Sequence, residues 1–274
     1  MKKDLFPPAI LMLSFFATAA FGQIPDSDVA ERAQWEEFLR AAEVVGERRM
    51  GDEEGVTRPW VLTLAKDGVT RRALWKNPEG VQRGVLEGWK YEIAAYLLDK
   101  HLGLNMVPPT VERVFRRRPG SCQLWISDTR DIESLLKEGQ SPPADRSRDY
   151  RRALFLQQAF DNLIGNDDRN WGNLLVTADW RVIFIDHSRA FRITPAFKTG
   201  LPFSAEAHPD VAVMRELPRA FVEKVRALDE PTVRAVVGDY LTREEVQEVL
   251  ARRALLVKEI DRLIQTHGED KVLY

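Results

Sequence analysis

Short apolar segments separated by turn residues dominate the first half of the chain, which is the pattern of β-strands. Residues 60–64 and 70–75 form two such segments, and the Asp-Gly pair between them is typical of a hairpin turn. Residues 122–126 form another strand-like segment. Between these strands, residues 87–104 place aromatic and aliphatic side chains at helical spacing. We therefore expect a strand-rich first half with one main helix.

In the second half, apolar residues recur at intervals of three and four, which predicts helices. A core helix is expected to run from the region of residue 149 to Gly165, and two more helices are expected within 215–240. A long final helix begins at the capping box of Thr242. The segment between the two halves, 127–148, has few apolar residues and two adjacent prolines, which favours a linker.

The first residues of the chain, 1–22, have the pattern of a secretory signal peptide. Two lysines follow the initial methionine, an apolar run spans 9–21, and small residues precede the expected cleavage after Gly22. The apolar run is shorter than the ~20 residues that a membrane-spanning helix needs. We therefore expect a secreted or periplasmic protein with no transmembrane segment after cleavage. An uncleaved anchor or a disordered tail is the alternative.

The composition is that of an ordinary globular protein, with 274 residues of which 44% are hydrophobic and 30% are charged. This length suffices for one large domain or for two lobes. The net charge of -2 gives no sign of nucleic-acid binding. Two local basic runs, at 116–118 and 151–152, are interpreted as solvated surface. Cys122 is the only cysteine, so no disulfide can form within the chain.

The most distinctive pattern is a polar loop between an apolar helix and an apolar hairpin. The loop carries Asp168 and, five residues later, Asn173, and the second strand of the hairpin ends in Asp186. This arrangement gathers two carboxylates and an amide at one loop edge, and such oxygen ligands suit Mg²⁺ together with phosphate oxygens. Aspartate and asparagine are also common turn formers. The apolar segments on either side favour a site over a plain turn.

Lys76 and Glu92 form a second candidate pair. Lys76 stands at the end of a strand, and Glu92 lies at the edge of the apolar face of the following helix. In kinase-type sites a strand lysine binds the phosphates and a helix glutamate holds that lysine. Gly51 and Gly55, placed four residues apart before the first strand, are candidates for a loop that covers the phosphates. The alternatives are a solvated strand end, a surface glutamate and an ordinary surface turn.

The order of these residues along the chain resembles that of the atypical kinase superfamily. This group includes the phosphatidylinositol 3-/4-kinases, the HipA-type bacterial kinases, the actin-fragmin kinases and the secreted Fam20-type kinases. The resemblance is specific within residues 160–191 and looser over the range 50–240. The positions that carry it are Lys76, Glu92, Asp168-Arg169, Asn173 and Asp186.

The resemblance implies an α+β, two-lobed protein-kinase-like fold. Its parts would be a strand-rich N-lobe with one main helix at 23–126, a hinge or linker at 127–148 and a mainly helical C-lobe at 149–274.

The resemblance also implies a role for each matched residue. Lys76 would contact the ATP phosphates, and Glu92 would hold Lys76 in place. Asp168 would be the catalytic base or would orient the acceptor hydroxyl. Asn173 and Asp186 would bind the metal. The hinge would pass the adenine through Leu124, Trp125 and Ile126.

The chain departs from the family pattern at two points. Asn170 replaces the usual histidine of the catalytic loop, which weakens the internal support of that loop. His187 and Ser188 replace the usual Phe-Gly pair after the metal aspartate. Neither change removes a metal ligand. Asp167 is an alternative to its neighbour Asp168, and the spacing to the asparagine favours Asp168.

These observations predict an ATP- and Mg²⁺-dependent phosphotransferase, with Mn²⁺ as the alternative metal. The γ-phosphate would move to a hydroxyl acceptor on a protein, a sugar, a lipid headgroup or a small molecule, and no sequence element identifies which. The main alternative is a secreted pseudokinase or a nucleotide-binding scaffold without turnover. A metal-dependent hydrolase and a non-catalytic envelope protein are the remaining alternatives.

Overall fold

The computed structural model describes residues 30–51, 58–82, 84–194, 200–204, 206–208 and 212–274. The expected signal peptide, 1–22, and Gly55 lie outside these ranges. Within them, no helix combines the length and the hydrophobicity needed to cross a bilayer.

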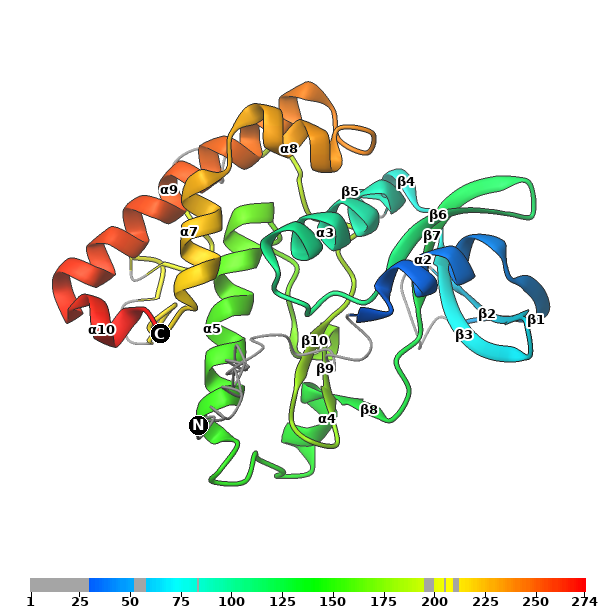
Figure 1. The fold of residues 1–274 in the computed structure, drawn as a ribbon, viewed down its shortest axis with the longest axis horizontal. Coiled ribbons are helices and arrows are strands. Elements are labelled where there is room, and N and C mark those ends of the chain that lie inside the picture. Colours follow the sequence, from blue (N-terminus) through cyan, green and yellow to red (C-terminus); the bar gives the residue numbers. More distant parts are fainter. Residues whose placement is uncertain (1–29, 52–57, 83, 195–199, 205, 209–211) are drawn as a thin grey trace, which may run out of the picture.

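A five-stranded antiparallel sheet forms one end of the molecule (Figure 1). Helix α2 (Arg32–Ala41) covers one face of this sheet, where Phe38 and Leu39 pack against Leu62 and Trp75. The strands are arranged in the order β1 (Glu43–Arg49), β2 (Trp60–Lys66), β3 (Val69–Lys76), β7 (Arg118–Leu124) and β6 (Thr110–Phe115).

Helix α3 (Trp89–Leu102) lies between this sheet and the helical half of the molecule (Figure 1). A small hairpin of β4 (Glu79–Gln82) and β5 (Val85–Gly88) leads into it. The helix ends at Gly103, whose φ of 76° is a left-handed conformation that glycine adopts without strain. Buried Asp99 then accepts hydrogen bonds from the backbone N–H groups of Met106 and Val107, which turns the chain back toward the sheet.

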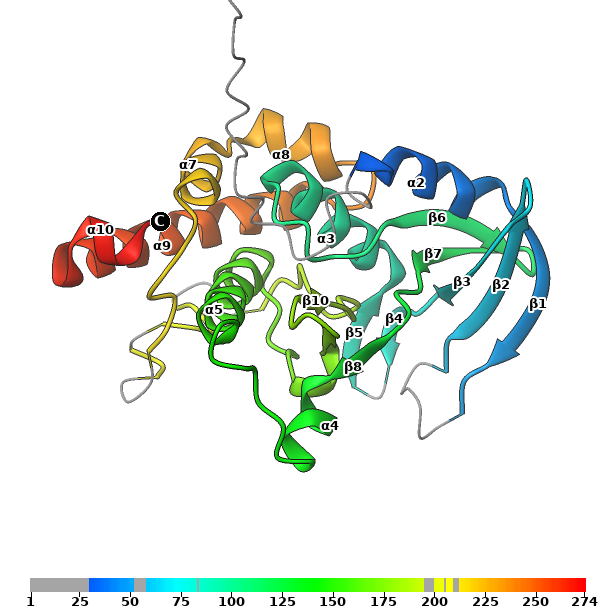
Figure 2. The same cartoon turned by 60° about the horizontal axis from the view of Figure 1, so that its bottom comes forward.

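The second half of the chain is mainly helical, with a small three-stranded sheet in the order β10-β9-β8. Figure 2 shows this half from a second direction. Its elements are β8 (Thr129–Asp131), α4 (Ile132–Lys137), α5 (Ser147–Ile164), the 3₁₀ helix η1 (Trp171–Asn173), β9 (Leu174–Thr177), β10 (Val182–Phe184), α7 (Arg219–Ala227), α8 (Glu230–Val237), α9 (Arg243–His267) and α10 (Glu269–Val272).

The α+β class is confirmed, and so is the capping box at Thr242, where Glu245 makes the reciprocal bond. Strands were not expected at β1 or at β8. The segment 127–148, expected as a linker, contains β8 and α4. Strand β8 pairs with β9 through Thr129 and Thr177, so this segment is attached to the second half by sheet hydrogen bonds.

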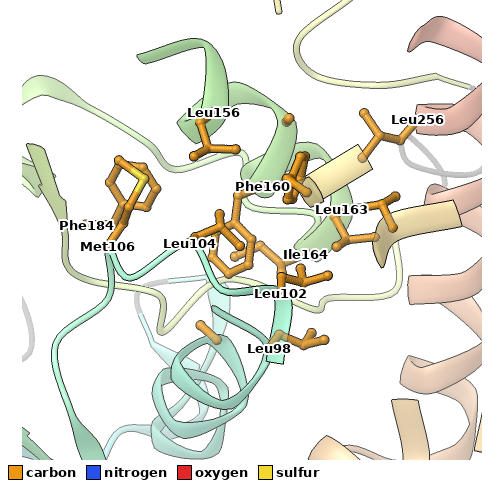
Figure 3. Close-up of a cluster of buried hydrophobic side chains, with 14 of the residues drawn as sticks. Leu98, Leu102, Leu104, Met106, Leu156, Phe160, Leu163, Ile164, Phe184 and Leu256 are labelled. Atoms are coloured by element: carbon orange, nitrogen blue, oxygen red, sulfur yellow. The ribbon is translucent and has the colours of Figure 1, made fainter. Parts of the chain in front are cut away.

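The main hydrophobic core lies where α3, α5, β10 and α9 meet (Figure 3). Phe160 of α5 is completely buried, and its ring stacks against Phe184 of β10 with centroids 6.4 Å apart. Leu98, Ile164 and Leu256 bring the three helices into the same cluster. This core fixes α5 relative to the hairpin that carries the candidate site.

Replacing Phe160 with alanine should lower the free energy of unfolding by about 3–5 kcal/mol, because the change removes buried apolar area and leaves a cavity. Leu136→Ala on α4, where the side chain is 55% exposed, is the control and should change stability by less than about 0.5 kcal/mol. Urea unfolding measures both. Equal effects of the two substitutions would show that the core does not depend on this ring.

Candidate functional site

Lys76 lies at the centre of the candidate site and forms ion pairs with two carboxylates. Its side chain is only 9% exposed, and its Nζ donates to Glu92 Oε1 at 2.7 Å and to Asp186 Oδ1 at 2.9 Å. The three residues come from the end of β3, the first turn of α3 and the segment after β10. Sheet, helix and hairpin therefore converge on one ammonium group.

The charges of this cluster stabilise one another. Burial by itself would lower the pKa of Lys76, but the carboxylates of Asp186 and Glu92 outweigh burial and raise that pKa. Burial would raise the pKa of Glu92, but the Lys76 ammonium and His187 lower it overall. The lysine stays protonated and the glutamate ionised across the neutral pH range.

Asp186 lies in a distinctive backbone position. Its φ of 60° is in the left-handed region, which aspartate tolerates better than most residues. Ser188 Oγ donates to its Oδ1 at 3.2 Å, the oxygen that also faces Lys76. The next residue, His187, donates its backbone N–H to Glu92 Oε2 at 2.9 Å. These bonds fix the loop after β10 against helix α3.

Asn173 is adjacent to this loop. Its carbonyl accepts from the N–H of Ile185 at 3.2 Å, across the β9–β10 hairpin. The hairpin therefore brings Asn173 beside Asp186, as expected from the sequence. Within the described part of the chain no group of three or more Asp, Glu, His or Cys side chains could hold a metal. The carboxylate of Asp186 and the amide oxygen of Asn173 are the groups here that could hold a metal, and Mg²⁺ usually takes only one or two carboxylates from a protein.

Asp168 and Asp167 are held by different arginines. The Asp168 side chain is 41% exposed, and its Oδ1 accepts from Arg189 Nη1 at 2.7 Å. Arg189 also forms an ion pair with Glu87, a residue of β5 that is 2% exposed. Asp167 instead pairs with Arg192. Through Arg189, Asp168 is connected both to the loop after Asp186 and to the hairpin in front of α3.

A buried ion pair connects helix α5 to the loop that carries Asp168. Asp161 of α5 is completely buried, and Arg169 donates to it through Nε at 2.8 Å and Nη2 at 3.0 Å. Arg169 Nη1 donates to the carbonyls of Ile185 at 2.7 Å and Asn173 at 3.1 Å. One guanidinium thus joins the core helix to the residue before β9 and to the residue after β10.

The two departures from the family pattern have structural roles of their own. Asn170 caps η1, because its Oδ1 accepts from the N–H of Gly172 at 3.0 Å. His187 is fully buried, and its Nε2 lies 3.0 Å from Arg169 Nη2. A buried histidine, His187, thus contacts the arginine of the loop, although position 170 holds an asparagine.

The hinge residues Leu124, Trp125 and Ile126 line a groove of about 620 Å³ together with Ile183 of β10. The guanidinium of Arg72 lies over the Trp125 ring at 4.8 Å. Arg72 is four residues before Lys76 on the same strand, a distance of about 13 Å. The groove and the ammonium thus lie along one strand.

The glycine loop expected to cover the phosphates is only partly within the described residues. Gly51 is exposed after the end of β1, and Gly55 lies outside the described ranges. Its role stays a prediction.

Four residues of the site were missed or given no role in the sequence analysis. They are Asp161, Arg169, Arg189 and Glu87. Asp161 had a detectable signal, because it is a lone charge within the apolar run 159–165 of the core helix. Glu87 and Arg189 are 102 residues apart in sequence, and no local pattern connects them.

Replacing Arg169 with methionine should lower the free energy of unfolding by about 3–5 kcal/mol, because it leaves the buried Asp161 carboxylate without its cation. The matched control is Arg130→Met, which breaks an exposed ion pair with Glu138 and should cost less than about 1 kcal/mol. Urea unfolding of both variants measures the difference. A loss no larger than that of the control would contradict the supporting role of Arg169.

The pKa shifts predict how stability depends on pH. The pKa of Glu92 is lowered from 4.5, so its contribution is complete above pH 4.5 and is lost as the pH falls below that value. The pKa of Lys76 is raised from 10.5, so its contribution is complete below pH 10.5 and is lost at higher pH. Glu92→Gln should therefore lower stability at neutral pH and reduce the further loss in acid. Unfolding curves of the wild type and the variant on both sides of pH 4.5 measure this, and parallel acid slopes would refute it.

Sequence comparison relates part of this chain to one curated protein. No family model matches the chain. Protein Rv2133c of Mycobacterium tuberculosis is 30% identical over 156 residues, which are 47% of this chain and 54% of that protein. The chain therefore spans about half the length of the curated relative that it matches.

Solved structures match over most of the chain. The structure of hydra Fam20 with sugar has a TM-score of 0.65 at 14% identity and covers 93% of this chain and 95% of its own. The crystal structure of the Golgi casein kinase has a TM-score of 0.63 at 17% identity, with coverage of 88% and 79%. The same kinase with Mn/ADP bound has a TM-score of 0.58 at 16% identity, with coverage of 91% and 79%. The resemblance to the atypical kinase-like superfamily is thus confirmed in the fold: this chain folds as the Fam20-type kinases do.

Proposed function

We propose that the chain is a phosphotransferase that uses ATP and a divalent metal and moves the γ-phosphate to a hydroxyl acceptor. The observation that carries the proposal is the Lys76 ammonium, buried between the carboxylates of Glu92 and Asp186. A strand lysine that a helix glutamate holds, next to a metal-binding aspartate, is the arrangement that kinases use to position nucleotide phosphates. In this proposal Glu92 positions Lys76, and Lys76 contacts the phosphates.

The free oxygen of Asp186 supports its proposed metal-binding role. The hydrogen bonds that this carboxylate accepts from Lys76 and Ser188 both use Oδ1. Within the described residues Oδ2 has no hydrogen-bond partner, and the side chain is 39% exposed. One carboxylate oxygen is therefore available, next to Asn173, for a divalent cation. The bound metal would neutralise charge on the phosphate oxygens.

Asp168 is proposed to receive the acceptor hydroxyl and to take its proton. Its half-exposed carboxylate is accessible to an acceptor from solvent, and Arg189 fixes its orientation. Phosphoryl transfer requires little covalent chemistry from the protein, so orientation and charge neutralisation are the main contributions. The groove beside Leu124, Trp125 and Ile126 is the proposed site of the adenine.

The proposal extends to the metal, the compartment and the acceptor class. The Golgi casein kinase structure with Mn/ADP bound supports a nucleotide with Mg²⁺ or Mn²⁺. Export of the chain is proposed from the signal-peptide pattern of residues 1–22. Sugar and protein hydroxyls are both acceptor classes in keeping with the names of the structural neighbours.

A pseudokinase is the second candidate function, and one contact favours it. The Asp168 carboxylate is already engaged by Arg189 at 2.7 Å. If this ion pair persists when nucleotide is bound, Asp168 is less able to accept a proton from a hydroxyl. The protein would then bind nucleotide without turning it over.

The proposal predicts that substitutions of Asp186 and Asp168 have different effects on nucleotide binding and on phosphate release. Asp186→Asn should abolish the metal-dependent rise in melting temperature that ATP causes. Asp168→Asn should keep that rise but reduce γ-phosphate release by about 100-fold or more, because it removes a general base. Thermal shift and phosphate release measure the two effects. The control is Asp145→Asn, whose side chain is 77% exposed and far in sequence from the site.

The outcomes separate the candidates. A wild-type protein that responds to ATP and metal but releases no phosphate would be the pseudokinase. An Asp186→Asn variant with an unchanged metal-dependent response would refute the metal site. A wild-type protein without any response to nucleotide would refute both candidates.

A further inference from the structure

A strongly basic pocket lies at the opposite end of helix α5 from the candidate site. It has a volume of about 560 Å³ and is lined by residues of the first turns of α5, of the end of α9 and of α10. Five cationic side chains line it, against the side-chain carboxylates of Glu216 and Asp270. The cations are Arg148, Arg151, Arg152, Arg215 and Lys271. This local excess of positive charge stands out in a chain whose net charge is -2.

Glu216 organises the arginines at the base of this pocket. It accepts from Arg152 Nε at 2.8 Å and from Arg148 at 3.2 Å and 3.3 Å, and Arg151 Nη2 lies 3.8 Å from its other oxygen. Burial would raise the pKa of Glu216, but the bonds from Arg152 and Arg148 lower it, so the carboxylate remains ionised. One carboxylate thus gathers three guanidinium groups from one helix.

Within the described residues, most of the hydrogen-bond donors of these guanidinium groups have no partner. Each guanidinium carries five N–H donors, whereas Glu216 takes two bonds from Arg148 and one from Arg152. Arg215 and Lys271 form no ion pair within the described residues. The Arg151 side chain is 57% exposed. Converging cations with free donors are what a multiply charged oxyanion requires.

The pocket wall restricts the orientation of the central arginine. The guanidinium of Arg152 lies over the ring of Tyr274 at 3.7 Å, and Phe155 and Leu273 add apolar surface. Stacking on an aromatic ring fixes the plane of the guanidinium, and a fixed fork favours bidentate binding of phosphate. Lysine-rich solvated surface has no such restriction.

The other basic run of the chain, 116–118, has a different environment. It lies on the turn between β6 and β7. Arg116 pairs with Glu47 and stacks over the Trp60 ring at 4.1 Å. Surface packing and an ion pair account for this run. The two runs had the same interpretation in the sequence, and the one on α5 lines a pocket.

We propose that the α5 pocket is a binding site for a small ligand that carries two or more phosphate groups, distinct from the nucleotide site. The first turns of α5 place the positive end of an 18-residue helix dipole at the same point. The helix is about 27 Å long, so its far end, where Asp161 supports the catalytic loop, is well separated from the pocket. A free oligophosphate and a bisphosphorylated sugar share the required chemistry.

Inorganic diphosphate is the simplest probe. Calorimetry on the protein without metal should show saturable binding at physiological ionic strength. The variant Arg151→Gln/Arg215→Gln/Lys271→Gln should weaken that binding by about tenfold or more, because several charge-assisted bonds are lost. Arg151 lies 3.8 Å from Glu216, whereas Arg148 and Arg152, which make the shorter bonds to Glu216, are left in place. The fold should therefore persist, and the unchanged melting temperature of the free variant checks this.

The matched control removes the same charge elsewhere, as Arg116→Gln/Arg117→Gln/Arg118→Gln, and should bind diphosphate like the wild type. Asp186→Asn should also bind it normally, which separates this site from the nucleotide site whether or not the protein is a kinase. Tighter binding of a sugar bisphosphate would identify a phosphorylated sugar as the ligand class. Equal losses in both triple variants, equal binding of citrate, or no diphosphate binding by the wild type would overturn the proposal.

Discussion

The structure depends on the buried contact between the Lys76 ammonium and two carboxylates. An ammonium that is largely removed from water is costly unless opposite charges lie within hydrogen-bond distance. Glu92 and Asp186 meet that requirement only when β3, α3 and the β9–β10 hairpin are all in place. The cluster therefore makes the sheet and the helical half depend on each other. The same contact leaves one oxygen of Asp186 available for the chemistry proposed here.

Two arginines extend this constraint to the rest of the site. Arg169 joins the buried Asp161 to the backbone carbonyls of Asn173 and Ile185, which flank the β9–β10 hairpin. Arg189 joins Asp168 to Glu87 in front of α3. Each guanidinium makes several bonds in one plane, which fixes geometry better than a single contact. A site built in this way holds its charged groups in position before a ligand arrives, which is what phosphoryl transfer needs from a protein.

The arginine contacts also explain why the departures from the family pattern need not disrupt the loop. Asn170 caps a 3₁₀ turn, and the buried ring of His187 lies against Arg169. The two ends of helix α5 contribute to two different sites. Its last turn supports the catalytic loop through Asp161, and its first turns present the arginines of the basic pocket.

Local patterns in the sequence determined the α+β class, the core helix, the capping box of α9 and the spacing of Asp168, Asn173 and Asp186. Each of these follows from residues close together in the chain, because periodicity, turns and caps are short-range effects. Strand β8 exists because a partner strand far along the chain, β9, completes its hydrogen bonds, and β1 exists because it pairs with β2. The pairing of Arg189 with Glu87, and the different environments of the two basic runs, were decided only by the tertiary structure. Contacts between residues a hundred positions apart depend on how the layers pack, and no local pattern encodes that packing.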